Sequence, residues 1–402
     1  MQTTGRRFSA LNLISQVRGT SSPKPKYFSL IDLGSDTIKV AVVEVGAGRV
    51  AVLGHSLATT QGRNVAGGRA EAAALAATVN GALKEAEDAS AAIAGQKVVP
   101  DHALFILPGR TLAGKLFTVK QRRPDPAQAI GQREVEALWE RATRLAQQGL
   151  PALPEVNADW IPQTISPAGL WLNNRLVNDL IGLQGQTISL AVYGVICQPA
   201  IVRGLEQLAE RLELTIYRMV PACQALTAVI PAREALVFDI GWGGTDCYLI
   251  RHDALVAAGH AFMGGDFFTR ALAKVFKHNV ADAEALKLAY SSSGVLSDKD
   301  KTLVERGLRA AYRRWAGLVI ETINHFEIGD MLPGQIYFAG GSVLLPGLQI
   351  FLLERLKAAG FTFDRAPDLT NLGDSPLPGY SHAPTAFRGM LFAPVLSLAK
   401  VV

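Results

Sequence analysis

Short apolar runs and longer amphipathic runs alternate along this chain of 402 residues. The runs "YFSLIDL", "TIKVAVVEV", "HALFIL" and "TISLAVYGVIC" are rich in the β-branched and aromatic residues typical of strands. The Ala-rich stretch 68–94, "PAIVRGLEQLAERLEL" and "GLQIFLLERLKAAG" instead have the length and apolar spacing of helices. This alternation predicts an α/β protein in which helices cover sheets.

The two halves of the chain begin with the same pattern: a strand, an aspartate, a glycine-containing turn and a second strand. The first copy is "LIDLGSDTIKVAVV" and the second is "LVFDIGWGGTDCYLI". If two such units face each other across a cleft, their turn amides can hold a polyphosphate from both sides, and each aspartate can hold Mg²⁺ through water. The repeat therefore predicts two similar halves around a nucleotide cleft.

Three motifs in a fixed order carry a resemblance to a known superfamily. "DLGSDTIK" and "DIGWGGTD" resemble the two phosphate motifs of the actin, sugar-kinase and heat-shock chaperone superfamily, and "IYFAGGSVLLPGL" resembles its adenosine motif. Within that superfamily, "MGGDFFTRALAKVF" and the segment that starts at "WIPQTISPAGLWLNN" are similar to the FtsA/PilM family of bacterial actins. The resemblance covers residues 28–398. It implies the actin-like ATPase fold with an FtsA-type inserted subdomain, called 1C.

The resemblance also implies a division of the chain into seven segments. They are an N-terminal arm (1–26), the first part of subdomain IA (27–97), the 1C insertion (98–197), the remainder of IA (198–235), the first part of IIA (236–265), a helical IIB-like subdomain (266–330), and the remainder of IIA with the closing helix of IA (331–402).

By the same resemblance, the cleft is expected to bind ATP with Mg²⁺. Asp32 and Asp239 would hold the metal through water. The expected nucleotide-binding residues of the first motif are Gly34, Ser35, Asp36 and Lys39, together with Asp32. Those of the other motifs are Asp239, Gly241, Gly243, Gly244 and Thr245, the helical pair Glu284 and Lys287, and Gly340, Gly341 and Ser342.

The second phosphate motif departs from the usual D-x-G-G-G-T-x-D. Trp242 stands where the second glycine belongs, and Gly244 stands where the threonine belongs. The missing hydroxyl removes a hydrogen bond to the terminal phosphate, a loss of about 1 to 3 kcal/mol. The indole can lie outside the cleft, cap the phosphates or fill their place, and the sequence leaves these three alternatives open.

A second departure concerns the attacking water. Val220 stands where MreB-like relatives have a water-positioning glutamate, and Gln224, one helical turn further on, is a weak catalytic candidate. With little to activate water, we expect ATP hydrolysis to be slow or absent.

Charge and cysteine content exclude several classes of protein. The net charge of +5 is modest, and no long Lys/Arg block predicts nucleic-acid binding. Three separate cysteines indicate neither a disulfide framework nor a zinc site, which fits a reducing cytoplasm. Residues 6–18 predict a basic amphipathic helix that would bind a membrane surface and replace the C-terminal tether of FtsA, although a disordered tail or a docked helix is the alternative.

These features favour an FtsA-like protein that binds ATP and polymerises at the inner face of the cytoplasmic membrane as a scaffold in cell division. Its expected partners are other copies of itself, an FtsZ-like division protein and the membrane, with no nucleic acid. A PilM-like role in pilus assembly is the alternative within the same fold. A small-molecule kinase is the alternative from another class, and the altered threonine position counts against it.

Overall fold

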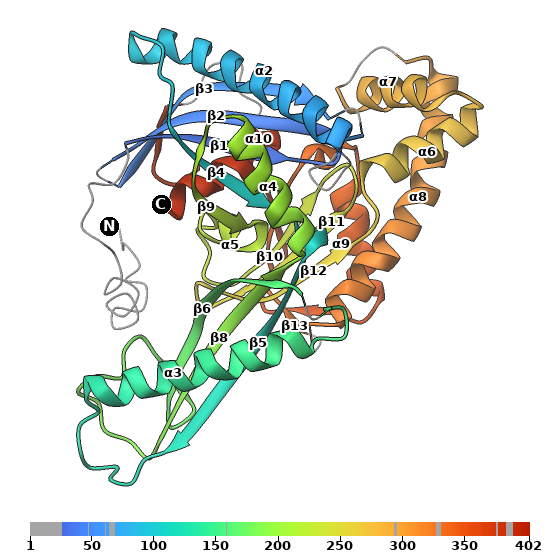
Figure 1. Ribbon diagram of the computed structural model, residues 1–402. Coiled ribbons are helices and arrows are strands. Elements are labelled where there is room, and N and C mark those ends of the chain that lie inside the picture. Colours follow the sequence, from blue (N-terminus) through green and yellow to red (C-terminus); the bar gives the residue numbers. More distant parts are fainter. Residues whose placement is uncertain are drawn as a thin grey trace.

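The computed structural model describes residues 26–46, 48–60, 62–63, 69–157, 159–292, 296–326, 331–374, 377–382 and 389–402. The amphipathic helix expected over residues 6–18 lies outside these ranges. Two mixed sheets with helices on their outer faces form the body of the molecule, and a third α/β unit projects from it (Figure 1). None of the described helices is long and apolar enough to cross a membrane.

The first sheet has six strands in the order β17-β3-β2-β1-β4-β9. The strands are β1 (Tyr27–Leu33), β2 (Thr37–Gly46), β3 (Arg49–Thr59), β4 (His102–Leu107), β9 (Thr215–Pro221) and β17 (Tyr380–His382). Strands β1, β2 and β3 form an antiparallel meander, whereas β4 and β9 add parallel to β1. The near-continuous apolar runs of β1 and β2 follow from burial of both faces of this sheet.

The second sheet repeats this arrangement in the order β12-β11-β10-β14-β16. Its strands are β10 (Ala235–Ile240), β11 (Thr245–Arg251), β12 (Ala254–Ala261), β14 (Gln335–Ala339) and β16 (Asp368–Asn371). Strands β10, β11 and β12 are antiparallel, and β14 and β16 are parallel to β10. The internal repeat predicted from the sequence is therefore present as two sheets of matching topology.

Helices separate the two sheets and cover their outer faces (Figure 1). A central core of apolar side chains joins the sheets through α5 (Ala222–Thr227) and α10 (Gly389–Ser397). On the outside, α2 (Arg69–Ala94) and α4 (Pro199–Arg211) pack on the first sheet. The second sheet is covered by α6 (Gly265–Phe276), α8 (Asp298–Asn324) and α9 (Leu348–Ala358), and α7 (Val280–Ser291) packs on α6.

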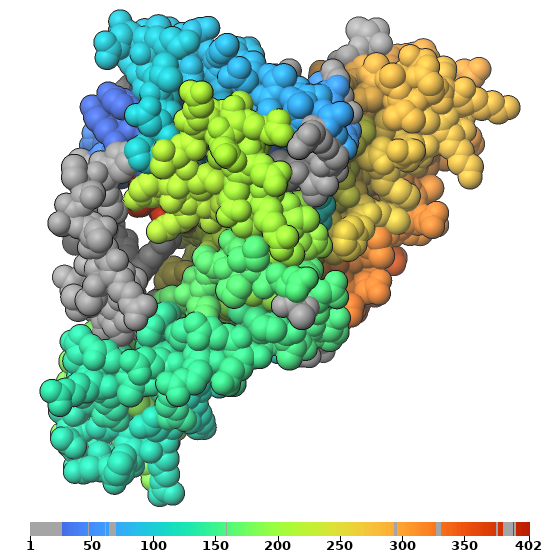
Figure 2. Space-filling view, in the orientation of Figure 1, coloured from blue at the N-terminus to red at the C-terminus, as the bar shows by residue number. Residues whose placement is uncertain are grey.

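The projecting unit lies between β4 and β9 in the chain, and Figure 2 shows it extending away from the body. A sheet of order β5-β8-β6-β7 carries the helix α3 (Gln132–Gly149) on one face. Its strands are β5 (Leu112–Arg122), β6 (Ile161–Leu172), β7 (Arg175–Val177) and β8 (Thr187–Cys197). We call this unit, residues 112–197, the insertion. Strands β5 and β6 also pack against β12 of the second sheet.

The insertion begins later than its expected start at residue 98. Strand β4 pairs in parallel with β1, with Ser29 opposite Ala103, and belongs to the first sheet. All of "ALFIL" in β4 is buried, which explains why this run is apolar on both faces.

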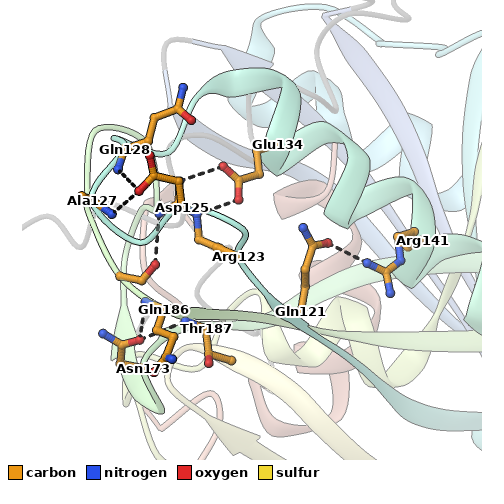
Figure 3. A network of polar contacts seen from close by, with 11 residues as sticks. Gln121, Arg123, Asp125, Ala127, Gln128, Glu134, Arg141, Asn173, Gln186 and Thr187 are labelled. Atoms are coloured by element: carbon orange, nitrogen blue, oxygen red, sulfur yellow. Dashed lines mark hydrogen bonds and ion pairs between the residues drawn. The ribbon is translucent and has the colours of Figure 1, made fainter.

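A buried ion pair fixes the far end of the insertion (Figure 3). The Arg123 guanidinium, after the end of β5, contacts both carboxylate oxygens of Glu134 in the first turn of α3, at 2.7 and 3.1 Å. It also donates to the Gly185 carbonyl at 3.0 Å. Because Arg123 is only 5% exposed, these partners must replace water in stabilising its charge.

Candidate functional site

A cavity of about 950 Å³ opens where the two repeated turns face each other. Both phosphate motifs, the helix α7 and the segment after β14 contribute to its wall. Of the expected site residues, the ones that line it are Asp32, Gly34, Ser35, Asp36, Lys39, Asp239, Gly241, Gly243, Gly244, Glu284, Lys287, Gly340, Gly341 and Ser342. The fold therefore brings together residues from four separate segments, in a space large enough for a nucleotide.

The first turn joins β1 to β2 and holds a buried ion pair. Gly34 donates its backbone N–H to the Thr37 carbonyl, which closes the turn at 2.9 Å. Asp32 at the end of β1 lies opposite Lys39 of β2, and Lys39 Nζ is 2.7 Å from Asp32 Oδ2. Both side chains are about nine-tenths buried, so the pair is held at the cavity wall with little water around it.

The second turn, between β10 and β11, places a second acid beside the first. Asp239 is half-buried at the cavity wall. Burial raises the pKa of its carboxyl to about 7, with the neighbouring Asp246 adding to the effect. Gly340 has a φ of +88°, and a β-carbon there would lie 2.6 Å from Asp239 Oδ1. The adenosine motif thus approaches this acid closely because residue 340 has no side chain.

The two turns meet across the cavity. A β-carbon on Gly243 of the second turn would lie 2.7 Å from Ser35 Oγ of the first. The Arg110 guanidinium, in the 3₁₀ turn Gly109–Thr111 after β4, donates to the same Ser35 hydroxyl. No ion pair joins Arg110 to an acid within the described ranges, so its positive charge remains available for an anionic ligand.

Trp242 forms part of the cavity wall rather than pointing away from it. Its indole lies beneath the Lys287 ammonium, with Lys287 Nζ 4.7 Å from the ring centroid. Lys287 is also 2.7 Å from Glu284 Oε2, and it donates to Thr269 Oγ1 at 2.9 Å. Burial lowers the pKa of this lysine, while Glu284 opposes that effect. Trp242 therefore connects the second phosphate motif to the pair expected to meet ribose and adenine.

Two expected site residues do not line the cavity. Thr245 is fully buried, and its hydroxyl donates to the Met263 carbonyl and accepts from Trp315 Nε1 at 2.8 Å, so it cannot serve a phosphate. The Gln224 amide donates to Ser166 Oγ of the insertion at 2.8 Å, which removes it as a water-orienting residue. The predicted roles of both residues are corrected by these contacts.

Three titratable residues of the lining were missed by the sequence analysis: Arg110, Asp246 and His260. His260 Nδ1 lies 2.6 Å from Asp246 Oδ1. No sequence motif joins residues 110, 246 and 260. They come together only because β12 pairs with β11, opposing His260 to Asp246, and because Gly109 permits a close approach: a β-carbon there would be 2.1 Å from Asp246 Oδ1.

The donor set of the cavity fits a hydrated Mg²⁺ and a polyphosphate. No group of three or more His, Cys, Asp or Glu side chains that would bind a metal directly occurs among the described residues. Asp32 and Asp239 instead supply carboxylates from opposite turns. A cation between them would favour the ionised form of Asp239 and so oppose the effect of burial on its pKa. Lys39, Arg110 and the backbone N–H groups of the turns supply the positive side of a phosphate site.

Comparisons with known proteins agree with this architecture. No family model matches the chain. The cell division protein FtsA of Streptococcus pneumoniae serotype 2 (strain D39 / NCTC 7466) is 24% identical over 345 residues, which are 80% of this chain and 72% of that protein. A solved structure described as a PilM-PilN type IV pilus biogenesis complex aligns with a TM-score of 0.66 at 20% identity, covering 94% of this chain and 98% of that one.

A second solved structure extends the agreement in fold. The ethanolamine utilization protein EutJ from Carboxydothermus hydrogenoformans aligns with a TM-score of 0.52 at 15% identity over 98% of both chains. The fold is that of the actin-like ATPases, and the resemblance to FtsA and PilM inferred from the motifs is confirmed.

Proposed function

We propose that this protein binds Mg²⁺-ATP in the cavity between its two sheets. The observation that carries the proposal is the pairing of two equivalent turns, each with an aspartate at the end of its first strand, around one cavity. Asp32 and Asp239 would hold the hydrated metal, and Lys39 and Arg110 would neutralise the phosphates. Lys287 and Glu284 would meet the ribose and base, next to the indole of Trp242.

The same cavity supports slow or absent hydrolysis. Val220 is only 2% exposed and cannot orient water, and Gln224 is bound to Ser166. Catalysis by proton transfer needs a positioned group within hydrogen-bond reach of the water. The bound nucleotide would then act as a conformational ligand that holds the two halves together rather than as a substrate turned over rapidly.

In the cell, we propose that the protein is a cytoplasmic scaffold at the inner face of the membrane. An FtsA-like role in division, with self-assembly into filaments, is supported by the similarity to the pneumococcal cell division protein. A PilM-like role in pilus assembly is equally supported by the alignment with the PilM-PilN complex. In both roles the insertion would meet a neighbouring subunit or partner, and the exposed face of α3 with Glu140, Arg141 and Arg144 is the surface we expect to take part.

The first experiment is a calorimetric titration of the full chain with Mg²⁺-ATP, with a non-hydrolysable analogue and with ATP in EDTA. We expect binding of the first two and a loss of at least tenfold in affinity without Mg²⁺. Absence of binding by all three would refute the nucleotide proposal. Pelleting with and without anionic vesicles then tests self-assembly, and titration with an FtsZ peptide and a PilN peptide separates the division role from the pilus role.

A further inference from the structure

The imidazole of His260 fills the space that a side chain at position 244 would need. A β-carbon built on Gly244 would lie 2.3 Å from both Cε1 and Nε2 of His260, far inside van der Waals contact. The motif of the superfamily places a threonine at this position, and here the following residue, Thr245, does not replace it because its hydroxyl is bound in the core. The histidine and the glycine are thus sterically linked.

The histidine is held in place but has one free nitrogen. Its Nδ1 contacts Asp246 Oδ1 at 2.6 Å, and its ring packs edge-on against Phe262 with centroids 4.6 Å apart. Its Nε2 is buried and has no hydrogen-bond partner among the residues that the structure describes. A buried polar atom without a partner is costly, and such an atom in the wall of a cavity indicates a ligand group.

We propose that His260, positioned by Asp246, takes over the role of the missing threonine and binds the terminal phosphate of the nucleotide. This inference rests on the proposed nucleotide function and names a residue for it. Asp246 accepts the Nδ1 proton, so the second proton of an imidazolium resides on Nε2, which then donates to a phosphate oxygen.

The neighbouring groups fit the terminal end of a polyphosphate. Asp246 lies against Gly109, and the next residue, Arg110, reaches Ser35 of the opposite turn. His260 therefore lies on the side of the cavity where the two turns converge, and Trp242 and Lys287 contact each other in another part of the wall. A ligand of His260 is expected to be the last phosphate of ATP, which ADP lacks.

The test compares affinities for Mg²⁺-ATP and Mg²⁺-ADP in the full chain and in variants. His260→Ala should lower the affinity for ATP by roughly 10- to 100-fold, the range for a hydrogen bond to a charged group, and change that for ADP by less than about threefold. His260→Gln, which retains an N–H donor, should recover part of the loss. Equal effects on ATP and ADP in His260→Ala, with its thermal unfolding unchanged, would overturn the inference.

A swap of the two residues provides an independent arm. Gly244→Ser alone should lower both Tm and ATP affinity, because its β-carbon overlaps the imidazole. Gly244→Ser combined with His260→Ala supplies the hydroxyl of the superfamily motif. This double variant should bind ATP at least fivefold more tightly than His260→Ala alone. The recovery is limited by the Ala261 carbonyl, which would lie 2.9 Å from the new β-carbon. A double variant that binds ATP no more tightly than His260→Ala contradicts the inference.

If the unaltered chain binds neither nucleotide, the proposed function fails as well. Nucleotide binding that is insensitive to substitution at position 260 refutes only this inference.

Discussion

The Lys287 ammonium lies over the face of the Trp242 indole, 4.7 Å from its centroid, at the wall of the cavity between the two sheets. This contact decides one of the three alternatives that the sequence leaves open for the indole. The indole does not point away from the cleft, because it lines the cavity and packs against Lys287. A cation over an indole contributes about 0.5 to 2 kcal/mol, depending on its exposure to water.

Trp242 should therefore report on the cavity. We predict that Mg²⁺-ATP changes the intrinsic fluorescence of the protein and that Trp242→Phe abolishes most of this change. Trp139→Phe, on α3 of the insertion, is the matched control and should retain it. A response that survives Trp242→Phe but disappears in Trp139→Phe would place the ligand elsewhere.

The Asp239 carboxyl should make the stability of the ligand-free protein depend on pH. Burial, followed by Asp246, raises its pKa from 3.8 to about 7, so between these values the folded protein holds a proton that the unfolded chain has released. The contribution of this group to stability therefore falls as the pH rises from about 4 to 7 and remains low above that range.

Replacing this acid by its amide should remove the dependence. The difference in the free energy of unfolding between Asp239→Asn and the unaltered chain should change in favour of the variant by up to about 4 kcal/mol as the pH rises from 4 to 8. This is the free energy that corresponds to a pKa shift of about three units. Urea unfolding at both pH values measures the difference. The exposed Asp159→Asn is the control. Parallel pH profiles for Asp239→Asn and the unaltered chain would show that residue 239 is not protonated in the folded state.

The ion pair of Asp32 and Lys39 should have separable structural and binding roles. Asp32→Asn leaves the buried Lys39 ammonium without its carboxylate, and we predict a loss of about 3 kcal/mol in stability together with loss of Mg²⁺-ATP binding. The double variant Asp32→Asn with Lys39→Met removes both charges and should regain most of the stability but no binding. Recovery of nucleotide affinity in the double variant would contradict a direct role for either side chain.

Arg123 should be essential for the order of the insertion. Arg123→Met leaves Glu134 and the Gly185 carbonyl without their partner, and we predict a loss of about 2 to 3 kcal/mol. Arg141→Met removes an exposed arginine whose side chain, among the residues that the structure describes, bonds only to Gln121 Oε1 (Figure 3). This variant should cost less than about 1 kcal/mol. Thermal unfolding compares the two, and hydrogen exchange of α3 shows whether the damage is local. Equal losses would mean that burial of Arg123 adds nothing.

The local sequence pattern predicted most of the fold, because the apolar pattern of most elements matches the strand or helix that they form. Strands such as β1 and β10 are apolar on both faces, and helices such as α3 and α4 carry apolar residues at helical spacing. Strand β6 was not recognised, since Pro162 and Pro167 interrupt its pattern. The structure accommodates them at register shifts in the part of β6 that β7 leaves unpaired on one edge.

The candidate site was predictable only where it lies in contiguous motifs. The turns around Asp32 and Asp239 are short segments with their own signature. Asp246 and His260 meet through the register between β11 and β12, and Arg110 reaches the cavity from the 3₁₀ turn after β4. No local pattern in the sequence brings these three residues together. The prediction for Thr245 was wrong because a shift of one residue along a strand turns a side chain to the opposite face of the sheet, here toward Trp315.

The packing of β12 against β5 and β6 connects the insertion to the proposed nucleotide site. One end of β12 carries His260 at the cavity, and the strand lies against the insertion, whose helix α3 carries the face proposed to meet a partner. Thermodynamic linkage is reciprocal: if a partner bound to the insertion tightens ATP binding by some factor, ATP tightens the partner by the same factor. With the slow hydrolysis proposed above, the ATP concentration in the cell would set the lifetime of the complex between the proposed scaffold and its partner.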